Sequence, residues 1–297
     1  MKLPANLRLG VCSHTGLVRT NNEDDYLLGA LLAPGTLFAG VADGMGGMAG
    51  GAEASRTALR AAAQGVLDGQ GRQNLAQRLR DGFSLAARRV HEASLALPAL
   101  REMGTTMTAI GIADGTVEVA HIGDTRLYRR RHGRCEQLTV DHAVREPDNL
   151  LTRCIGAGQA TAEPDVASFA ATPGDRLLLV SDGVWSVLSP AGLLRAVEAA
   201  DAQRCAEDLV AAALAAGGPD NATAVVVDVL AATGEGTVEQ ELPRDERTNA
   251  RGGWPRAVSL RPPLWPWLLA AAGALLLVHG SLRWAGVVNG LAVLWRG

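Results

Sequence analysis

The 297-residue chain has few cysteines, histidines and aromatic residues, and Lys2 is its only lysine. No two of its four cysteines form a C-x-x-C pair, and no histidine stands at zinc-ligand spacing, so we expect reduced thiols and no structural zinc. The first ten residues hold no long apolar run, which predicts a cytoplasmic rather than a secreted domain. A net charge of −3 argues against nucleic-acid binding through a basic face.

Apolar residues make up 47% of the chain and charged residues 20%, so a packed core is expected. The apolar patterns predict strands at 37–42, 106–113, 117–122, 127–130, 176–180 and 222–230, and helices at 52–67, 74–97 and 189–199, with another ending at 216. Asp114-Gly115 predicts a hairpin turn. Two early helices, intervening strands and two late helices favour an α+β sandwich.

The composition changes after residue 230. Residues 231–263 mix acidic residues and arginines with glycine and proline and have no apolar period, which is typical of a linker. Residues 264–278 carry no charge, and with their extension to Leu282 they approach the ~20 residues that cross a bilayer. We therefore expect a domain at 1–230, a linker at 231–263 and a membrane anchor at 264–297, as one span or a short hairpin.

Acidic residues recur at the ends of the predicted strands. They are Asp43, Asp124, Asp182 and Asp220, with the adjacent pair Glu23-Asp24 nearer the start. One Asp-Gly pair is most often a plain turn. Carboxylates gathered at one sheet edge, however, repel one another unless a cation neutralises them. Ligand sets made only of oxygen select Mg²⁺ or Mn²⁺ over zinc, so the pattern predicts a site for such ions.

Two such ions commonly activate a water molecule, and hydrolysis of a phosphate ester is the natural use of that chemistry. Arg19, a few residues before Glu23-Asp24, is the candidate to hold the phosphate anion. A lone arginine is usually a solvated surface charge, and only its place beside the acid pair favours the binding role.

Seven short motifs then follow one another in order. They are VRTNNED (18–24), VADGMGGMAGG (41–51), MGTT (103–106), IGDTR (122–126), LLTRCIG (150–156), SDGVW (181–185) and DNAT (220–223). Over about residues 10–230 this set resembles the bacterial PPM-type (PP2C-like) serine/threonine protein phosphatases. The resemblance implies a four-layer α-β-β-α sandwich of two antiparallel sheets flanked by helices. It also implies two Mn²⁺ or Mg²⁺ ions at one end of the sheets, with a third, weaker ion in bacterial members.

The resemblance also implies ligands for these ions. Asp43 would bridge the two ions, and Gly44 would offer its backbone carbonyl to one of them. Asp182 and Asp220 would complete the ligand set of the other ion. Asp124, together with Asp182, would hold the third.

Further roles follow from the same resemblance. Glu23 and Asp24 would act mostly through ion-bound water, Asn221 would support that network, and Arg19 would grip the substrate phosphate. The implied mechanism is direct attack of a metal-bridging hydroxide on phosphoserine or phosphothreonine, without a phosphoenzyme. The implied partners are phosphorylated proteins and a cognate Ser/Thr kinase. With the anchor, we expect the catalytic domain on the cytoplasmic side of the cell inner membrane.

Two departures from the family pattern affect these expectations. Met45 stands where many relatives carry a histidine proposed as the general acid, so leaving-group protonation would fall to bound water. His142 is near in motif order, but we interpret it as structural. Only residues 143–149 separate the Asp-His pair from the Leu-Thr-Arg motif, so the flap found there in relatives is short.

Three other readings compete with a protein phosphatase. Residues 44–49 match the dinucleotide-binding pattern G-x-G-x-x-A, but Asp43 would place a negative charge beside the pyrophosphate. A membrane-tethered pseudophosphatase would bind phosphoproteins without hydrolysing them, although such proteins lose metal acids that are all present here. Hydrolysis of a small phosphate ester is the third.

Overall fold

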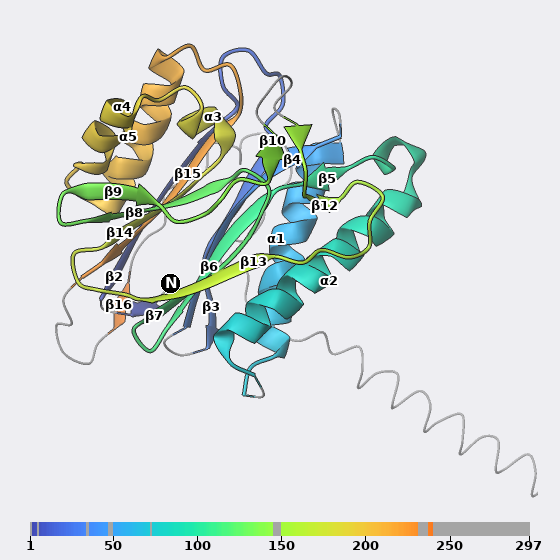
Figure 1. Ribbon diagram of the computed structural model, residues 1–297, viewed down its shortest axis with the longest axis horizontal. Coiled ribbons are helices and arrows are strands. Elements are labelled where there is room, and N and C mark those ends of the chain that lie inside the picture. Colours follow the sequence, from blue (N-terminus) through green and yellow to red (C-terminus); the bar gives the residue numbers. More distant parts are fainter. Residues whose placement is uncertain are drawn as a thin grey trace, which may run out of the picture. The chain divides into compact units, whose positions relative to one another are not determined.

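The computed structural model describes residues 2–4, 6–33, 36–46, 50–71, 73–144, 150–230 and 237–239. Figure 1 shows two β-sheets lying face to face, with helices on the outer side of each. Every strand pairing in them is antiparallel. The order of layers is α-β-β-α, as the resemblance implied.

The first sheet has seven strands. They are β3 (Asp24–Ala33), β4 (Thr36–Met45), β5 (Gly104–Thr105), β6 (Met107–Ala113), β7 (Thr116–Ile122), β12 (Ile155–Gly156) and β13 (Asp165–Ala170). Its order is β12-β5-β4-β6-β7-β13. β5 and β6 pair with successive parts of β4, and β3 also pairs with β4, along residues 36–43. The predicted hairpin joins β6 to β7. Asp114 and Gly115 have φ of 49° and 72°, as a type I′ turn requires.

The second sheet has five strands in the order β2-β15-β14-β8-β9. They are β2 (Leu7–His14), β8 (Arg126–Arg131), β9 (Arg134–Gln137), β14 (Arg176–Val180) and β15 (Ala222–Val229). Two small ladders lie outside both sheets, β1 (Lys2–Pro4) with β16 (Thr237–Glu239) and β10 (Ala143–Val144) with β11 (Leu150–Leu151). β16 falls within the segment predicted to be a linker.

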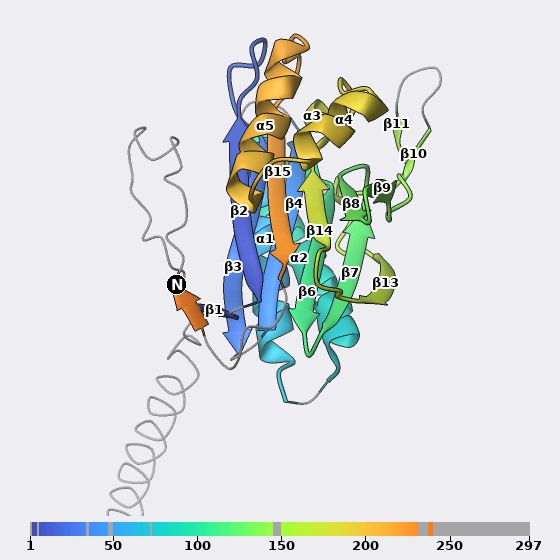
Figure 2. The same ribbon diagram turned by 90° about the vertical axis from the view of Figure 1, so that its left-hand side faces the viewer.

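Helices α1 (Gly50–Asp68) and α2 (Leu75–Ala96) cover the first sheet. Helix α5 (Ala202–Ala215) covers the second sheet and packs beside α4 (Pro190–Val197), as Figure 2 shows from the side. The short helices are α3 (Asp182–Trp185) and the 3₁₀ helix η1 (Pro98–Leu100). The predicted N-cap Ser189 is confirmed, because its hydroxyl accepts a hydrogen bond from Gly192 N.

Apolar clusters in the described part of the chain hold neighbouring layers together. One lies between the sheets and draws Leu9, Val41, Ile110, Leu179 and Val227 from both. Another lies between the second sheet and the helices over it, including Leu178, Val226, Cys205 and Leu209. Because these strands are covered on both faces, their sequences are continuous apolar runs rather than alternating ones.

The structure differs from the sequence-based prediction at several elements. The strands of the two sheets that were not predicted are β2, β3, β5, β9, β12 and β13. The helix predicted to reach residue 199 ends at Val197, because Glu198 leaves helical geometry and its N–H bonds to Arg195 O in a tightened last turn. Within the described ranges, no helix has both the length and the apolar character to cross a bilayer. The predicted anchor at 264–297 lies outside those ranges.

Candidate metal and phosphate site

The first sheet places two of the predicted acids side by side. Asp24 lies directly opposite Asp43 in the β3–β4 ladder. Directly opposed residues present their side chains on the same face, with Cβ atoms ~5 Å apart. Asp24 is only 2% exposed, and Ser181 Oγ, from the residue that follows β14 of the second sheet, donates a 2.7 Å hydrogen bond to its Oδ2. The pair of carboxylates therefore lies where the two sheets meet.

The second sheet and the crossing to it supply three more acids. Asp182 begins α3 two residues after the end of β14, and Asp220 lies two residues before β15. Val180 pairs with Ala224 in the β14–β15 ladder, so both acids emerge at the same end of the sheet. Asp124 lies in the turn between β7 and β8, where the chain crosses from the first sheet to the second.

These acids surround one open cavity of about 510 Å³. Its carboxylates are Glu23, Asp43, Asp124, Asp182 and Asp220. Arg19 and Gly44 also line it, and Asn221 lies at its wall. The structure thus brings all the predicted site residues to one place. Asp24 does not line the cavity itself but lies beside Asp43 in the β3–β4 ladder.

Arg19 reaches the cavity from the loop before β3. Its Nη2 lies 2.7 Å from Asp220 Oδ2, while 54% of the side chain remains exposed. An arginine held on one side and open on the other can offer its remaining donors to an anion. The geometry therefore fits the predicted phosphate-binding role.

Asn221 fastens the loop that carries Arg19. Its Nδ2 donates hydrogen bonds to the carbonyls of Thr15 (2.7 Å) and Asn21 (2.8 Å). Its Oδ1 accepts from the backbone N–H of Glu23 at 2.8 Å. These three hydrogen bonds of the Asn221 amide all go to the loop, so in this structure Asn221 positions Arg19 and Glu23.

The glycines after Asp43 and Asp182 serve close approach rather than a turn. A Cβ on Gly44 would lie 2.1 Å from Gly51 O, and one on Gly183 would lie 2.0 Å from Asn221 O. Neither glycine has positive φ. The plain-turn interpretation of these Asp-Gly pairs is therefore wrong. Glycine is needed because another backbone segment touches the chain just beyond each carboxylate.

The buried carboxylates raise one another's pKa values. Burial, followed by the charges of Asp24, Asp182 and Asp124, holds the pKa of Asp43 well above its usual range. Burial raises the pKa of Asp24 to about 7, and burial with the charge of Asp182 raises that of Asp124 to about 6. Such a cluster favours protons or cations in the cavity.

The residues present fit a divalent cation. The acidic donors are all oxygen, and Asp182 Oδ1 is buried without a hydrogen-bond partner in the described residues. Among the described residues, no three His, Cys, Asp or Glu side chains lie close enough to one another to coordinate an ion without other ligands. An ion here would therefore keep water ligands, which is the habit of Mg²⁺.

His142 is structural, as predicted. Its Nδ1 accepts from Gly123 N, and its Nε2 lies 3.0 Å from Asp165 Oδ2. It also stacks on the buried His121, with ring centroids 4.8 Å apart. Met45 lines the cavity, whereas His142 does not, so no histidine replaces the missing one among the described lining residues. Residues 145–149 of the short flap lie outside the described ranges.

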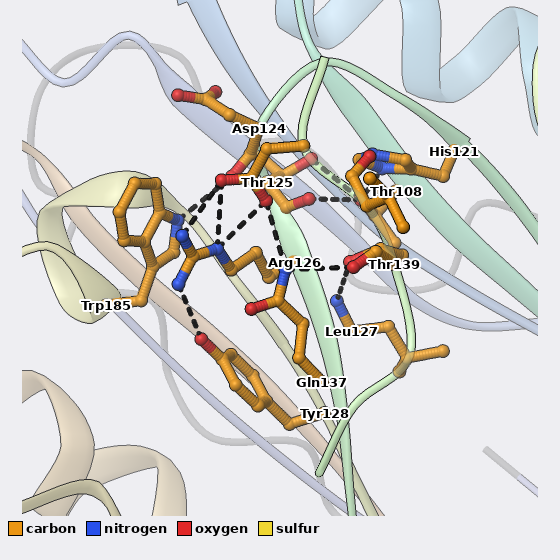
Figure 3. Close-up of polar contacts among 12 residues, drawn as sticks. Thr108, His121, Asp124, Thr125, Arg126, Leu127, Tyr128, Gln137, Thr139 and Trp185 are labelled. Carbon is orange, nitrogen blue, oxygen red and sulfur yellow. Dashed lines mark hydrogen bonds and ion pairs between the residues drawn. The ribbon is translucent and has the colours of Figure 1, made fainter. Parts of the chain in front are cut away.

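Sequence reasoning missed three residues that hold the site acids. Ser181 bonds Asp24, and Trp185 Nε1 donates to the backbone carbonyl of Asp124 at 2.9 Å. Arg126 stacks on Trp185 (Figure 3). One signal was available, since Trp185 is the only tryptophan in the first 250 residues.

Together the fold and the site define a two-sheet sandwich with a cavity lined by carboxylate oxygens at one end. Arg19 lies at the edge of this cavity, where it can bind a phosphate. The sequence matches the protein phosphatase 2C family over residues 15–217. The chain belongs to this family.

Individual relatives agree with that assignment. The chain is 36% identical over 244 residues to the serine/threonine protein phosphatase PstP of Mycobacterium tuberculosis, covering 75% of this chain and 45% of PstP. It therefore spans less than half of that relative. It is 29% identical to the protein phosphatase PhpP of Streptococcus pneumoniae, covering 75% of this chain and 98% of PhpP. A crystal structure of the PstP catalytic domain with two manganese ions superposes with a TM-score of 0.68 at 33% identity, covering 76% of this chain and 99% of that one.

Proposed function

We propose that this chain is a metal-dependent protein phosphatase that hydrolyses phosphoserine and phosphothreonine. The observation that carries the proposal is one cavity lined by five carboxylates and by Arg19, which forms an ion pair with Asp220. Membership of the protein phosphatase 2C family and the manganese in the related PstP domain support it.

The residues that would hold two Mn²⁺ or Mg²⁺ ions are Asp43, Asp182, Asp220 and the backbone carbonyl of Gly44. Asp124 with Asp182 would hold a third. When bound, the ions supply an activated water nucleophile and neutralise phosphate charge. Their presence would also relieve the mutual repulsion that raises the pKa values of the buried acids.

The chain's own residues bind and orient the phosphate. Arg19 donates charge-assisted hydrogen bonds to its oxygens, and Asn221 keeps the Arg19 loop in place. Divalent ions held by these acids would supply an activated water, so we propose attack by water rather than by a side chain. The cavity is open to solvent on the Arg19 side, which suits a phosphorylated residue presented by a protein.

Hydrolysis of a phosphothreonine peptide by the full chain tests the proposal. We expect phosphate release with Mn²⁺, none with EDTA, and full recovery when excess Mn²⁺ follows EDTA. Activity that survives EDTA would contradict metal dependence. Measured Mn²⁺ binding without turnover would favour the phosphoprotein-binding reading, and faster turnover of small phosphate esters would favour a metabolite substrate.

We further propose that the chain opposes a Ser/Thr kinase and is held at the inner membrane by residues 264–297. The uncharged run over 264–278 supports only the anchor, and the kinase follows from the proposed phosphoprotein substrate. The full chain is expected to stay with membranes after an alkaline carbonate wash, and Leu276→Arg is expected to weaken that retention because a central arginine costs several kcal/mol in a bilayer. Release of the unaltered chain by carbonate would contradict the anchor.

A further inference from the structure

The turn that carries Asp124 is held by hydrogen bonds from outside itself. Gly123 N donates to His142 Nδ1 (3.1 Å), and His142 N donates back to Gly123 O (2.7 Å). On the next residues, Thr108 Oγ1 donates to Thr125 O at 2.9 Å. Two of the three carbonyls in this turn are therefore fixed by the first sheet and by the segment after β9.

Trp185 supplies the remaining bond, to Asp124 itself. Its indole N–H donates to Asp124 O at 2.9 Å. Trp185 is the last residue of α3, and Asp182 is the first. One turn of helix therefore carries both the Asp182 carboxylate and the donor that holds the Asp124 backbone. In Figure 3 the Asp124 carboxylate points away from Trp185 and Arg126, so neither covers its oxygens.

Arg126 holds the indole ring in place. Its Cζ lies 3.4 Å from the centre of the Trp185 ring. The guanidinium is itself anchored on both sides, to Asp141 through Nε (3.0 Å) and Nη2 (2.8 Å), and to Tyr128 Oη through Nη1 (2.8 Å). The ion pair is nearly buried, with 13% of Arg126 and 8% of Asp141 exposed, so its geometry is held firmly.

We propose that Trp185, held by Arg126, is a positioning residue that sets the Asp124 carboxylate against Asp182 and thereby determines how tightly the chain binds a divalent cation between these two acids. The choice of cation rests on the proposed function. Neither Trp185 nor Arg126 lines the cavity, whereas Asp124 and Asp182 both do. The effect therefore passes through the backbone of Asp124.

Two variants of the full chain test this inference by Mn²⁺ calorimetry without substrate. Trp185→Phe keeps an aromatic ring and removes the donor, and Arg126→Lys keeps the charge and removes the planar fork. Loss of such an outer hydrogen bond commonly weakens metal binding by roughly 10- to 100-fold. We expect that loss in the weakest Mn²⁺ binding event of both variants, with the tighter events unchanged.

Arg176→Lys is the matched control. Arg176 binds Asp228 through Nε (2.6 Å) and Nη2 (2.8 Å), is 11% exposed, and lies at the far end of β14 from Asp182. It is expected to lower the metal-free Tm while leaving every Mn²⁺ binding event unchanged.

The titration separates positioning from a general structural role. If Trp185→Phe and Arg126→Lys lower the Tm but bind Mn²⁺ like the unaltered chain, the inference is wrong. It is also wrong if Arg176→Lys weakens the same binding event, or if the unaltered chain binds no Mn²⁺. The Mn²⁺ titration needs no turnover, so its result is independent of the phosphopeptide assay. If the chain hydrolyses no phosphopeptide but the variants still show the expected loss of Mn²⁺ affinity, the proposed function is wrong and this inference stands.

Discussion

Substitution of Asn for Asp43 is expected to reduce kcat on a phosphothreonine peptide about 10³-fold or more. Asp43 lies opposite Asp24 in the first sheet. After burial, the negative charges of Asp24, Asp182 and Asp124 also raise the pKa of its carboxyl group. A neutral amide binds divalent cations far more weakly than a carboxylate does. Bound cations contribute several kcal/mol to the transition state, and each ~1.4 kcal/mol is tenfold in rate. The measurement is kcat of the full chain at saturating Mn²⁺.

Asp114→Asn is the control for this variant, because it makes the same chemical change in the exposed turn between β6 and β7. It is expected to leave kcat unchanged. Activity of Asp43→Asn within about tenfold of the unaltered chain would contradict the assigned role of Asp43, a tenfold loss corresponding to only ~1.4 kcal/mol.

The same variant is expected to raise the Tm of the EDTA-treated chain at neutral pH. A carboxyl whose pKa is higher in the folded than in the unfolded state opposes folding once the pH exceeds its unfolded value. The stabilisation by Asn should therefore grow as the pH rises above ~4 and should disappear below it. Mn²⁺ should raise the Tm of the unaltered chain by more than that of the variant, which keeps only the acids away from Asp43. A simple folding defect would instead lower the metal-free Tm.

Removal of the Arg19 guanidinium is expected to lower kcat/KM for the phosphopeptide about 10- to 100-fold. Hydrogen bonds to a charged group contribute ~1.5–3 kcal/mol, and Arg19 is the cationic side chain lining the described cavity. Arg19→Ala should also weaken inhibition by inorganic phosphate, which shares the same oxygens. Arg19→Lys should recover part of the loss, because it keeps the charge without the planar fork.

Arg89→Ala is the matched control for Arg19. Arg89 forms an ion pair of the same 2.7 Å length with Glu92 and is 59% exposed, but it lies on α2, outside the cavity lining. It should leave both kcat/KM and phosphate inhibition unchanged. Unaltered phosphate inhibition in Arg19→Ala would show that Arg19 serves only its bond to Asp220.

Local patterns were sufficient for several elements of the fold. The three-to-four-residue recurrence of apolar residues predicted the helix that the structure shows as α2, and it runs through Leu79, Phe83, Ala87 and Val90. The Asp114-Gly115 dipeptide predicted its hairpin because both residues accept positive φ. β3 escaped prediction for a physical reason, since two register irregularities against β4 interrupt the alternation that identifies a strand.

For the site, too, one part could be predicted from the sequence and another part depends on the tertiary structure. The sequence alone was enough to predict the residues that we propose bear the chemistry, because carboxylates at the ends of apolar strands and an arginine beside them are visible as local patterns. Only the tertiary structure decided which atoms meet. Asn221 fastens a loop 200 residues away, and Trp185 holds Asp124 across 61 residues. Such contacts arise when two sheets pack face to face, so no local pattern encodes them.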